Sequence, residues 1–217
     1  MKLVTIQKQA YLKDPCGSSS LPYWKMADIL AQPQVTIVHE RDFHAKDFAG
    51  YRDQRFFRLI HHLQRIDAPV VPKGYYVRTI SIPEELDRLV DLINQCYQDI
   101  SVNRNQMLFW TASPVFDPHL WVGVCEESTS ELVGAGIAEI DDTIQEGILE
   151  WIQVLPKHQQ SGIGQCLVRT LLERLKGKVD FVTVSGDLDN PTNPEKLYRS
   201  TGFTGNDIWH ILTKQSK

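Results

Sequence analysis

The sequence predicts an α+β fold, and three observations lead to this prediction. Residues 148–155 form an apolar run with β-branched and aromatic side chains, which is typical of a buried strand. Two glycines follow, Gly162 and Gly164, and apolar residues then recur at the spacing of an amphipathic helix as far as Leu175. From residue 75 onward, strands and helices are expected in the order βααβββαβαβ.

Each element of this second part depends on a periodicity or a turn signal. Residues 81–84 read Ser-Ile-Pro-Glu, a capping box that predicts a helix start. The apolar stripe of that helix comprises Leu86, Leu89, Val90, Ile93, Cys96 and Tyr97. Pro156 ends the strand at 148–155 because proline cannot donate to a ladder. The other expected elements are a strand at 75–81, a helix at 106–112, strands at 120–126 and 132–140 joined by a hairpin at 127–130, a strand at 181–185, a helix at 194–201 and a strand at 207–213.

Residues 1–74 are an N-terminal extension with a different organisation. The expected elements are a strand at 2–7, a loop at 14–20, a helix at 21–31 that Ser20 caps, and a strand at 34–40. Residues 55–64 fit a helix or a strand, and a strand is preferred because a turn at 50–53 precedes them. The proline-bounded stretch 67–74 reads as a linker, so we expect two parts, 1–74 and 75–217.

The turn before the helix at 162–175 is a candidate anion site. A helix start presents unpaired N–H groups and partial positive charge, and glycines let an anion approach the backbone closely. A P-loop is excluded because Gln165 and Cys166 follow Gly164 where that motif needs Lys and Ser or Thr. The dinucleotide fingerprint needs three glycines after an early strand, and only two occur here, late in the chain.

A third type of loop fits. Gln159, Gly162 and Gly164 follow a strand that ends Val154-x-Pro156, and Leu197-Tyr198 with Gly202-Phe203 lies about 40 residues further on. Together these two motifs resemble the GCN5-related N-acetyltransferase (GNAT) superfamily over residues 75–217, but not over residues 1–74. The second motif departs from the family pattern, because Asn190 and Asn193 straddle the usual asparagine position and Pro194 replaces a small residue.

The resemblance implies a mixed sheet whose fourth and fifth strands splay apart to accept the pantetheine arm of acetyl-CoA. The backbone of Ile152, Gln153 and Val154 is then expected to face the pantetheine. Gln159 stands where many members have Arg, so a donor is kept and a charge is lost. The remaining residues expected at the cofactor are Gln160, Ser161, Gly162, Ile163, Gly164, Gln165, Asn190, Asn193 and Tyr198.

Two side chains are the catalytic candidates. Tyr198 matches the family's recurrent general-acid tyrosine, and the alternative is that it only packs the last helix. Glu150, a carboxylate within an apolar strand, is the candidate base; alternatively it faces solvent or an ion pair, and a water serves as base. His158 is expected to be a solvated loop residue, and not a catalyst.

Composition limits the class of protein. The chain has 217 residues and a net charge of −4, which argues against non-specific nucleic-acid binding. Four dispersed cysteines without metal or CxxC spacing predict buried thiols in a reducing cytosol. For His61-His62, an exposed or hydrogen-bonded pair is preferred to a metal site, and no metal is predicted. No apolar run approaches the length of a membrane span and no signal peptide is apparent, so we expect a cytoplasmic protein that does not bind membranes.

The resemblance predicts an N-acetyltransferase that uses acetyl-CoA and acts on a primary amine of a small molecule or peptide. A non-catalytic acyl-CoA sensor and a protein-interaction module stay open as alternatives. The N-terminal extension carries enough aromatic side chains to fold, and we expect it to help form the acceptor side through groups such as His39, Glu40 or Arg58. The alternative is a stabilising cover or a dimer contact, so a homodimer also stays open.

Overall fold

The computed structural model describes residues 6–26, 35–97 and 100–214. The chain divides into two compact units. The first unit comprises Met1–His61, Thr183–Arg199 and Phe203–Lys217, and the second comprises His62–Val182 and Ser200–Gly202.

The second unit contains an antiparallel sheet in the strand order β6-β5-β4-β3. Its strands are β3 (Tyr75–Thr79), β4 (Phe116–Glu126), β5 (Leu132–Asp141) and β6 (Glu146–Val154). Strand β7 (Phe181–Asp187) begins in this unit and continues into the first. The long strands are continuous apolar runs because helices cover both faces, which removes the usual alternation of polar and apolar residues.

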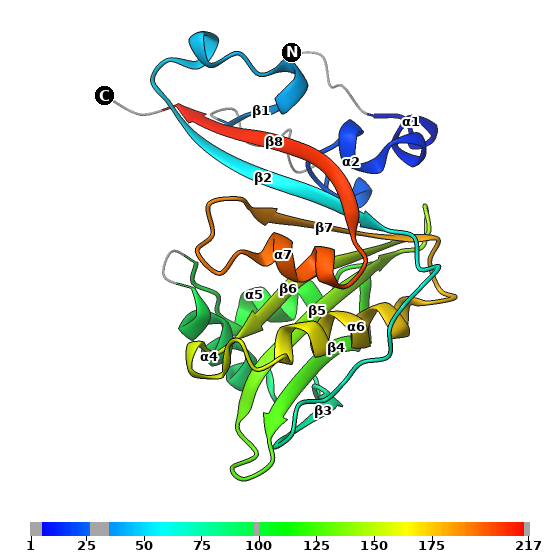
Figure 1. Cartoon of the computed structure of the whole chain (residues 1–217), viewed down its shortest axis with the longest axis vertical. Helices are drawn as coiled ribbons and strands as arrows, with labels where there is room; N and C mark the ends of the chain where they lie inside the picture. Colours follow the sequence, from blue (N-terminus) through cyan, green and yellow to red (C-terminus); the bar gives the residue numbers. More distant parts are fainter. Residues whose placement is uncertain (1–5, 27–34, 98–99, 215–217) are drawn as a thin grey trace. The chain divides into compact units, whose positions relative to one another are not determined.

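Helices lie on both faces of this sheet (Figure 1). Helices α4 (Leu86–Cys96) and α5 (Arg104–Thr111) cover one face, and α6 (Ile163–Leu175) covers the other. Helix α4 buries Leu86, Leu89, Leu92 and Ile93, and α6 buries every position of its apolar stripe. A Cβ at Gly136 would lie 2.9 Å from Leu171 Cδ1, so a glycine here lets α6 approach β5 closely.

The first unit combines the N-terminal segment with the C-terminal strand. Its strand order is β1-β8-β2-β7, and both β1 and β2 pair with β8 in antiparallel fashion. The elements are α1 (Lys8–Lys13), α2 (Pro15–Ser18), the 3-10 helices η1 (Tyr23–Lys25), η2 (Glu40–Asp42) and η3 (Ala45–Phe48), strands β1 (Val35–His39), β2 (Tyr51–His61) and β8 (Thr204–Lys214), and helix α7 (Pro194–Ser200), whose last residue is grouped with the second unit. Strand β2 therefore lies between β7 and β8 and is an integral part of this sheet.

Packing in the first unit includes a buried guanidinium. Arg58 on β2 donates to Tyr11 Oη at 2.8 Å, Ser185 Oγ at 3.1 Å and Thr183 Oγ1 at 3.2 Å. Trp209 Nε1 donates to the carbonyl of Cys16 at 2.8 Å. These bonds tie the short N-terminal helices to β2, β7 and β8, since buried donors of this kind need partners.

The element order predicted from residue 75 onward is confirmed, with β3, α4, α5, β4, β5, β6, α6, β7, α7 and β8 in sequence. The preferred strand at 55–64 is also confirmed, as β2. Residues 62–74 carry no helix or strand. The four cysteines are free, and Cys16, Cys125 and Cys166 are buried as expected, whereas Cys96 is only half-buried.

Three local predictions are wrong. The loop at 14–20 contains helix α2, which forms because Asp14 accepts a hydrogen bond from the Gly17 N–H and Pro15 suits the first turn. The helix expected at 21–31 is wrong at its start, where a 3-10 turn, η1, extends as far as Lys25. Residues 27–34 lie outside the described residues, as do residues 2–5 of the strand expected at 2–7. Helix α4 begins at Leu86 and lacks the predicted capping box, because Glu85 binds the Ser81 N–H and Arg78.

Candidate functional site

The glycine loop of the second unit, residues 155–165, connects β6 to α6. Strand β6 ends at Val154, Leu155 is buried, and a 3-10 turn at Pro156–His158 follows. Gly162 is the N-cap of α6 with φ of 89°, and no side chain caps the helix. A side chain at Gly162 would be strained at this φ, which explains why glycine ends the loop.

The start of α6 presents backbone N–H groups. The Cys166 N–H donates to the Gly162 carbonyl at 3.0 Å, the first α-helical hydrogen bond. The N–H groups of Ile163, Gly164 and Gln165 therefore precede that bond, and no side-chain cap competes for them. Ile163 is buried and fixes the first turn. The residues fit a pyrophosphate, because this end combines N–H donors with partial positive charge and a glycine backbone.

The polar side chains of the loop mostly bind the protein itself. Gln159 Nε2 donates to the Val154 carbonyl at 3.1 Å, and Ser161 Oγ donates to the His158 carbonyl. Gln165 Nε2 donates to Ser200 Oγ at 3.3 Å. Gln159, predicted as a donor to the cofactor, thus contributes to the shape of the loop in this structure.

His158 is not the solvated residue that was expected. It is buried, its Nδ1 shares a hydrogen bond of 2.8 Å with Tyr75 Oη, and the two rings meet edge to face. Its burial follows from β3, which brings Tyr75 to the loop. A Cβ at Gly162 would lie 3.6 Å from Pro72 Cγ, so the linker also reaches the loop. Sequence reasoning missed Tyr75 and Pro72 because no local signal links a strand residue and a linker proline to a loop far along the chain.

Strand β6 carries a β-bulge at the candidate base. The register runs from Ile137↔Trp151 to Ala138↔Leu149, so one residue, Glu150, lies in the irregularity. Bulges redirect side chains and are common beside active sites. Glu150 is half-buried, and therefore less enclosed than the apolar strand context predicted. Ile152 faces α6, since it lies with Leu171 around Gly136.

Tyr198, Asn190 and Asn193 are located in the first unit. Tyr198 is 6% exposed, and its ring lies 6.1 Å from that of Phe57 and 5.7 Å from that of Phe203. Asn190 Oδ1 accepts from the Thr192 N–H and Oγ1, and Asn193 Oδ1 accepts from the Lys196 N–H. The two asparagines thus shape the turn before α7, which accounts for a pair at this position.

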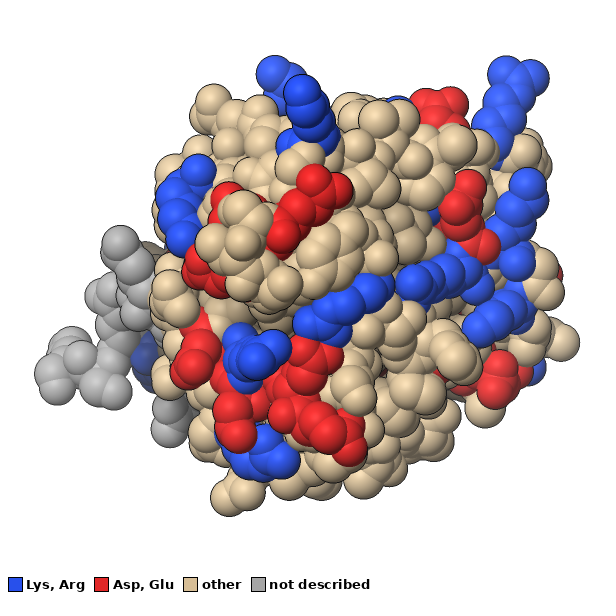
Figure 2. All heavy atoms as spheres, turned by 90° about the horizontal axis from the view of Figure 1, so that it is seen from below, with Lys and Arg blue, Asp and Glu red and all other residues tan. Residues whose placement is uncertain are grey.

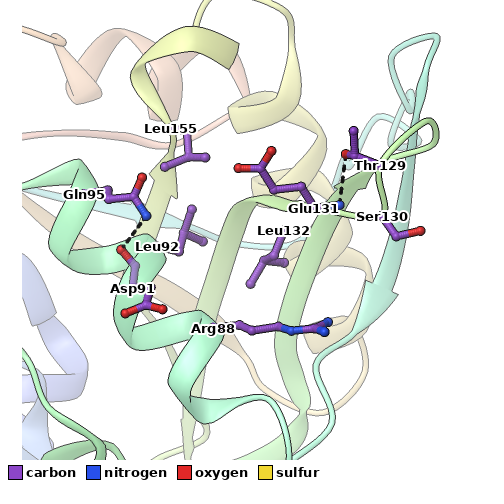
Figure 3. Close-up of a pocket in the computed structure, with 9 residues that line it drawn as sticks. All are labelled: Arg88, Asp91, Leu92, Gln95, Thr129, Ser130, Glu131, Leu132 and Leu155. Atoms are coloured by element: carbon purple, nitrogen blue, oxygen red, sulfur yellow. Dashed lines mark hydrogen bonds between the residues drawn. The ribbon is translucent and has the colours of Figure 1, made fainter.

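A pocket of about 350 Å³ lies in the second unit between α4 and the β4–β5 hairpin, and Leu155 at the start of the glycine loop also lines it (Figure 3). Leu92, Leu132 and Leu155 form its apolar floor, and Arg88, Asp91 and Glu131 contribute charges. Two of these charges are already paired, Arg88 with Glu85 at 3.5 Å and Glu131 with Lys157 at 3.0 Å. None of the residues predicted for the cofactor or for catalysis lines this pocket.

Surface charge, metal ligands and helix length limit the kinds of site that the described residues can form. Basic and acidic side chains are interspersed on the face drawn in Figure 2. Within residues 6–26, 35–97 and 100–214, no group of three or more His, Cys, Asp or Glu side chains is arranged to hold a metal. Over the same residues, no helix has the length and apolar character needed to cross a bilayer. His61 is buried against Phe203, and His62 is exposed.

Comparison with known protein families finds a match for part of the chain. Residues 117–205 match the acetyltransferase (GNAT) domain family, a stretch that includes the glycine loop, α6 and Tyr198. The match covers less than half of the chain, and solved GNAT structures share its α+β fold. None of the curated proteins matches the sequence.

Solved structures support the fold. A GCN5-related N-acetyltransferase from Sphaerobacter thermophilus has a TM-score of 0.69 and 18% identity. The match covers 86% of this chain and 63% of that one. A tandem GNAT protein from the clavulanic acid biosynthesis pathway has a TM-score of 0.59 and 18% identity, covering 90% of this chain and 70% of that one. A chain of the NatC complex bound to Gag peptide and CoA has a TM-score of 0.54 and 13% identity, covering 66% of this chain and 99% of that one.

Proposed function

We propose that this protein transfers an acetyl group from acetyl-CoA to a primary amine of a small molecule or peptide. The observation that carries the proposal is the glycine loop. Gly162 at φ 89° begins a helix that no side chain caps, within a stretch that matches the GNAT domain family. The match over residues 117–205 supports acyl transfer in general, and the acetyl donor and the amine acceptor are the finer parts of the proposal.

The proposal assigns the cofactor contacts as follows. The N–H groups of residues 160–165 bind the pyrophosphate. The backbone of Ile152, Gln153 and Val154 binds the pantetheine amides through the edge of β6. Asn190 and Asn193 hold the turn that precedes α7.

Two side chains of this chain move protons in the proposed reaction. When bound, acetyl-CoA supplies a thioester whose carbonyl carbon is open to attack by an amine. Glu150, or a water that it holds, takes a proton from the acceptor nitrogen. The Tyr198 hydroxyl gives a proton to the departing sulfur. The bulge at Glu150 supports this role because it places a carboxylate at an irregular, half-buried point of the strand.

The test is release of free CoA from acetyl-CoA with a panel of primary amines. Turnover that depends on the amine supports an N-acetyltransferase. Tight CoA binding without turnover for any amine would favour an acyl-CoA sensor, and failure to bind CoA would leave an interaction module. Propionyl-CoA and succinyl-CoA in parallel assays test the choice of acyl donor.

A further inference from the structure

Three aromatic side chains with no part in the proposed chemistry gather on one face of β6. Tyr97 follows α4, Trp110 belongs to α5 and Trp151 to β6. The Trp110 and Trp151 rings are stacked with centroids 5.7 Å apart, and Tyr97 meets Trp151 edge to face at 5.6 Å. We call these three residues the aromatic surface.

The aromatic surface lies on the face of the sheet opposite α6. Side chains alternate along a strand, so Trp151 and Gln153 share one face while Ile152 points to the other. Ile152 lies with Leu171 of α6, whereas Trp151 contacts residues of α4 and α5. This arrangement separates the aromatic surface from the side of β6 that carries α6.

The aromatic surface is partly open to solvent. Tyr97, Trp110 and Trp151 are each half-buried. Helix α5 exposes further apolar side chains beside Trp110 in the chain, with Phe109 78% and Leu108 38% exposed, and Ile100 before the helix is 42% exposed. Partly exposed aromatic side chains that contact one another, as Tyr97, Trp110 and Trp151 do, mark binding surfaces more often than single exposed residues do.

A second observation points to a ligand on the same face. Gln153 is 3% exposed, and neither its Nε2 nor its Oε1 has a hydrogen-bond partner among the described residues. A buried amide with both polar atoms unsatisfied is costly, and such a group is normally satisfied by a water or ligand. Gln153 can donate one hydrogen bond and accept another at the foot of the aromatic surface.

The aromatic surface is also uncharged. Burial raises the pKa of the Tyr97 hydroxyl to about 12, with a smaller contribution from Cys96, and burial raises the pKa of the Cys96 thiol to about 11. Both groups are neutral near pH 7. A polyamine or an amino acid would need carboxylates or guanidinium groups to match its charges, and the aromatic surface contains neither.

We propose that the acceptor is an amine carried on an apolar skeleton with a ring. The aromatic surface binds that skeleton, and the Gln153 amide binds the polar end of the acceptor. The inference rests on the proposed function, because it names the acceptor class of the same reaction. Rings stack on rings in offset or edge-to-face arrangements, and an ammonium group is also attracted to an indole face.

The experiment compares 2-phenylethylamine with ethanolamine in wild type, Trp110→Leu and Trp110→Phe, at saturating acetyl-CoA. We expect Trp110→Leu to raise KM for 2-phenylethylamine about tenfold with kcat little changed, and Trp110→Phe to restore most of the loss. KM for ethanolamine and the affinity for CoA should not change. Equal KM values for 2-phenylethylamine in all three proteins, or a preference for ethanolamine, would overturn the inference.

A binding experiment separates a failure of this inference from a failure of the proposed function. Quenching of tryptophan fluorescence by 2-phenylethanol, which has no amine to acetylate, should saturate in wild type and weaken in Trp110→Leu but not in Trp110→Phe. Quenching of this kind without any acetyl transfer would support the aromatic surface while removing the proposed function. Acetyl transfer to ethanolamine without saturable quenching would support the proposed function and contradict binding of the acceptor by the aromatic surface. Melting curves of both variants verify that each is folded before either result is used.

Discussion

Tyr198 is a buried side chain whose ring packs in the first unit and whose hydroxyl is the proposed proton donor. Its ring contacts Phe57 and Phe203, so its apolar part has partners in the first unit whether or not its hydroxyl takes part in chemistry. The proposed role as proton donor depends on the hydroxyl alone. Packing and chemistry can therefore be separated by a substitution that keeps the ring.

We predict that Tyr198→Phe lowers kcat by roughly 10²–10⁴-fold, because a general acid contributes about that much. Binding of CoA and the melting temperature should stay close to wild type, since the ring contacts are kept. Steady-state kinetics and a CoA titration measure the two effects. A kcat within a factor of two of wild type would leave Tyr198 with a packing role only.

A second residue-scale prediction concerns the pair that joins β3 to α4. Arg78 Nη2 donates to Glu85 Oε1 at 2.6 Å, and the Glu85 side chain also accepts from the Ser81 N–H at 3.0 Å. The hydrogen bond from Arg78 is the largest cause that lowers the pKa of Glu85 below its usual value of 4.5. Because the folded-state pKa is lowered, the stabilisation is present above about pH 4.5 and is lost as pH falls through that lowered value.

Glu85→Gln should therefore reduce the free energy of unfolding at pH 7 by about 1–2 kcal/mol. The difference from wild type should shrink as pH falls from about 4.5 through the lowered pKa of Glu85, because protonation then removes the charge of the wild-type carboxylate. Chemical denaturation at pH 7, 5 and 3.5 measures this narrowing. A difference that is constant across the three pH values would show that Glu85 acts through packing.

At the scale of elements, the close approach of β5 and α6 supports the glycine loop. A Cβ at Gly134 would lie 2.9 Å from Ile163 Cγ2, in the first turn of α6, whereas one at Gly136 would lie 2.9 Å from Leu171 Cδ1, two turns later. The two glycines thus form a matched pair. Only the first substitution would press on the residue that fixes the start of the helix.

We predict that Gly134→Val and Gly136→Val each destabilise the fold by about 1–3 kcal/mol through overpacking. Gly134→Val should in addition weaken CoA binding at least several-fold, while Gly136→Val should leave it near wild type. Calorimetric titration at a temperature where both variants are folded measures the affinities. Equal losses of CoA affinity in the two variants would mean that α6 shifts as one body and that Ile163 has no particular role in positioning the glycine loop.

The sequence predicted elements well where one periodicity dominates. The apolar stripe of α6 and the turn at Gly162 are local features, so both were placed correctly, and so was β2 despite the ambiguity of residues 55–64. Predictions failed where side chains form hydrogen bonds with partners other than the predicted ones. Glu85 binds Arg78, and the start of α4 therefore moves past the predicted capping box.

At the candidate site too, local features could be predicted from the sequence and features that depend on distant residues could not. The loop glycines could be found because they act through their own backbone. The burial of His158 could not, because it depends on Tyr75, which is 83 positions away in the chain. The bulge at Glu150 depends on the register with β5, which residue spacing along β6 does not encode.

At the scale of the whole molecule, residues 1–74 were expected to be an extension beside a complete catalytic domain, and that division stays a prediction. Within the first unit, however, β2 lies between β7 and β8, and β8 pairs with β1 on its other edge. Strand β8 therefore takes both of its partners from the N-terminal segment. Pairing between the two ends of a chain leaves no periodic mark in either segment, so the sequence alone did not predict it.

A chain that begins at Lys73 should accordingly fail to fold stably, because β8 would present two unpaired edges. We expect poor solubility or a melting transition without cooperativity, and a synthetic peptide of residues 35–61 should partly restore order. Circular dichroism and limited proteolysis measure both results. A soluble, cooperative chain of residues 73–217 that binds CoA would show that the segment is a detachable extension.

The central claim is that the loop at Gly162 and Gly164 binds CoA, and calorimetric titration with acetyl-CoA tests it most directly. We predict saturable binding by the wild type, and stabilisation of the fold by about 2.7 kcal/mol when the ligand is at 100 times its Kd. Gly164→Glu, which brings a side chain and a negative charge to the pyrophosphate site, should abolish both effects while the unliganded fold persists. No binding by the wild type at millimolar acetyl-CoA, or equal binding by Gly164→Glu, would contradict the account.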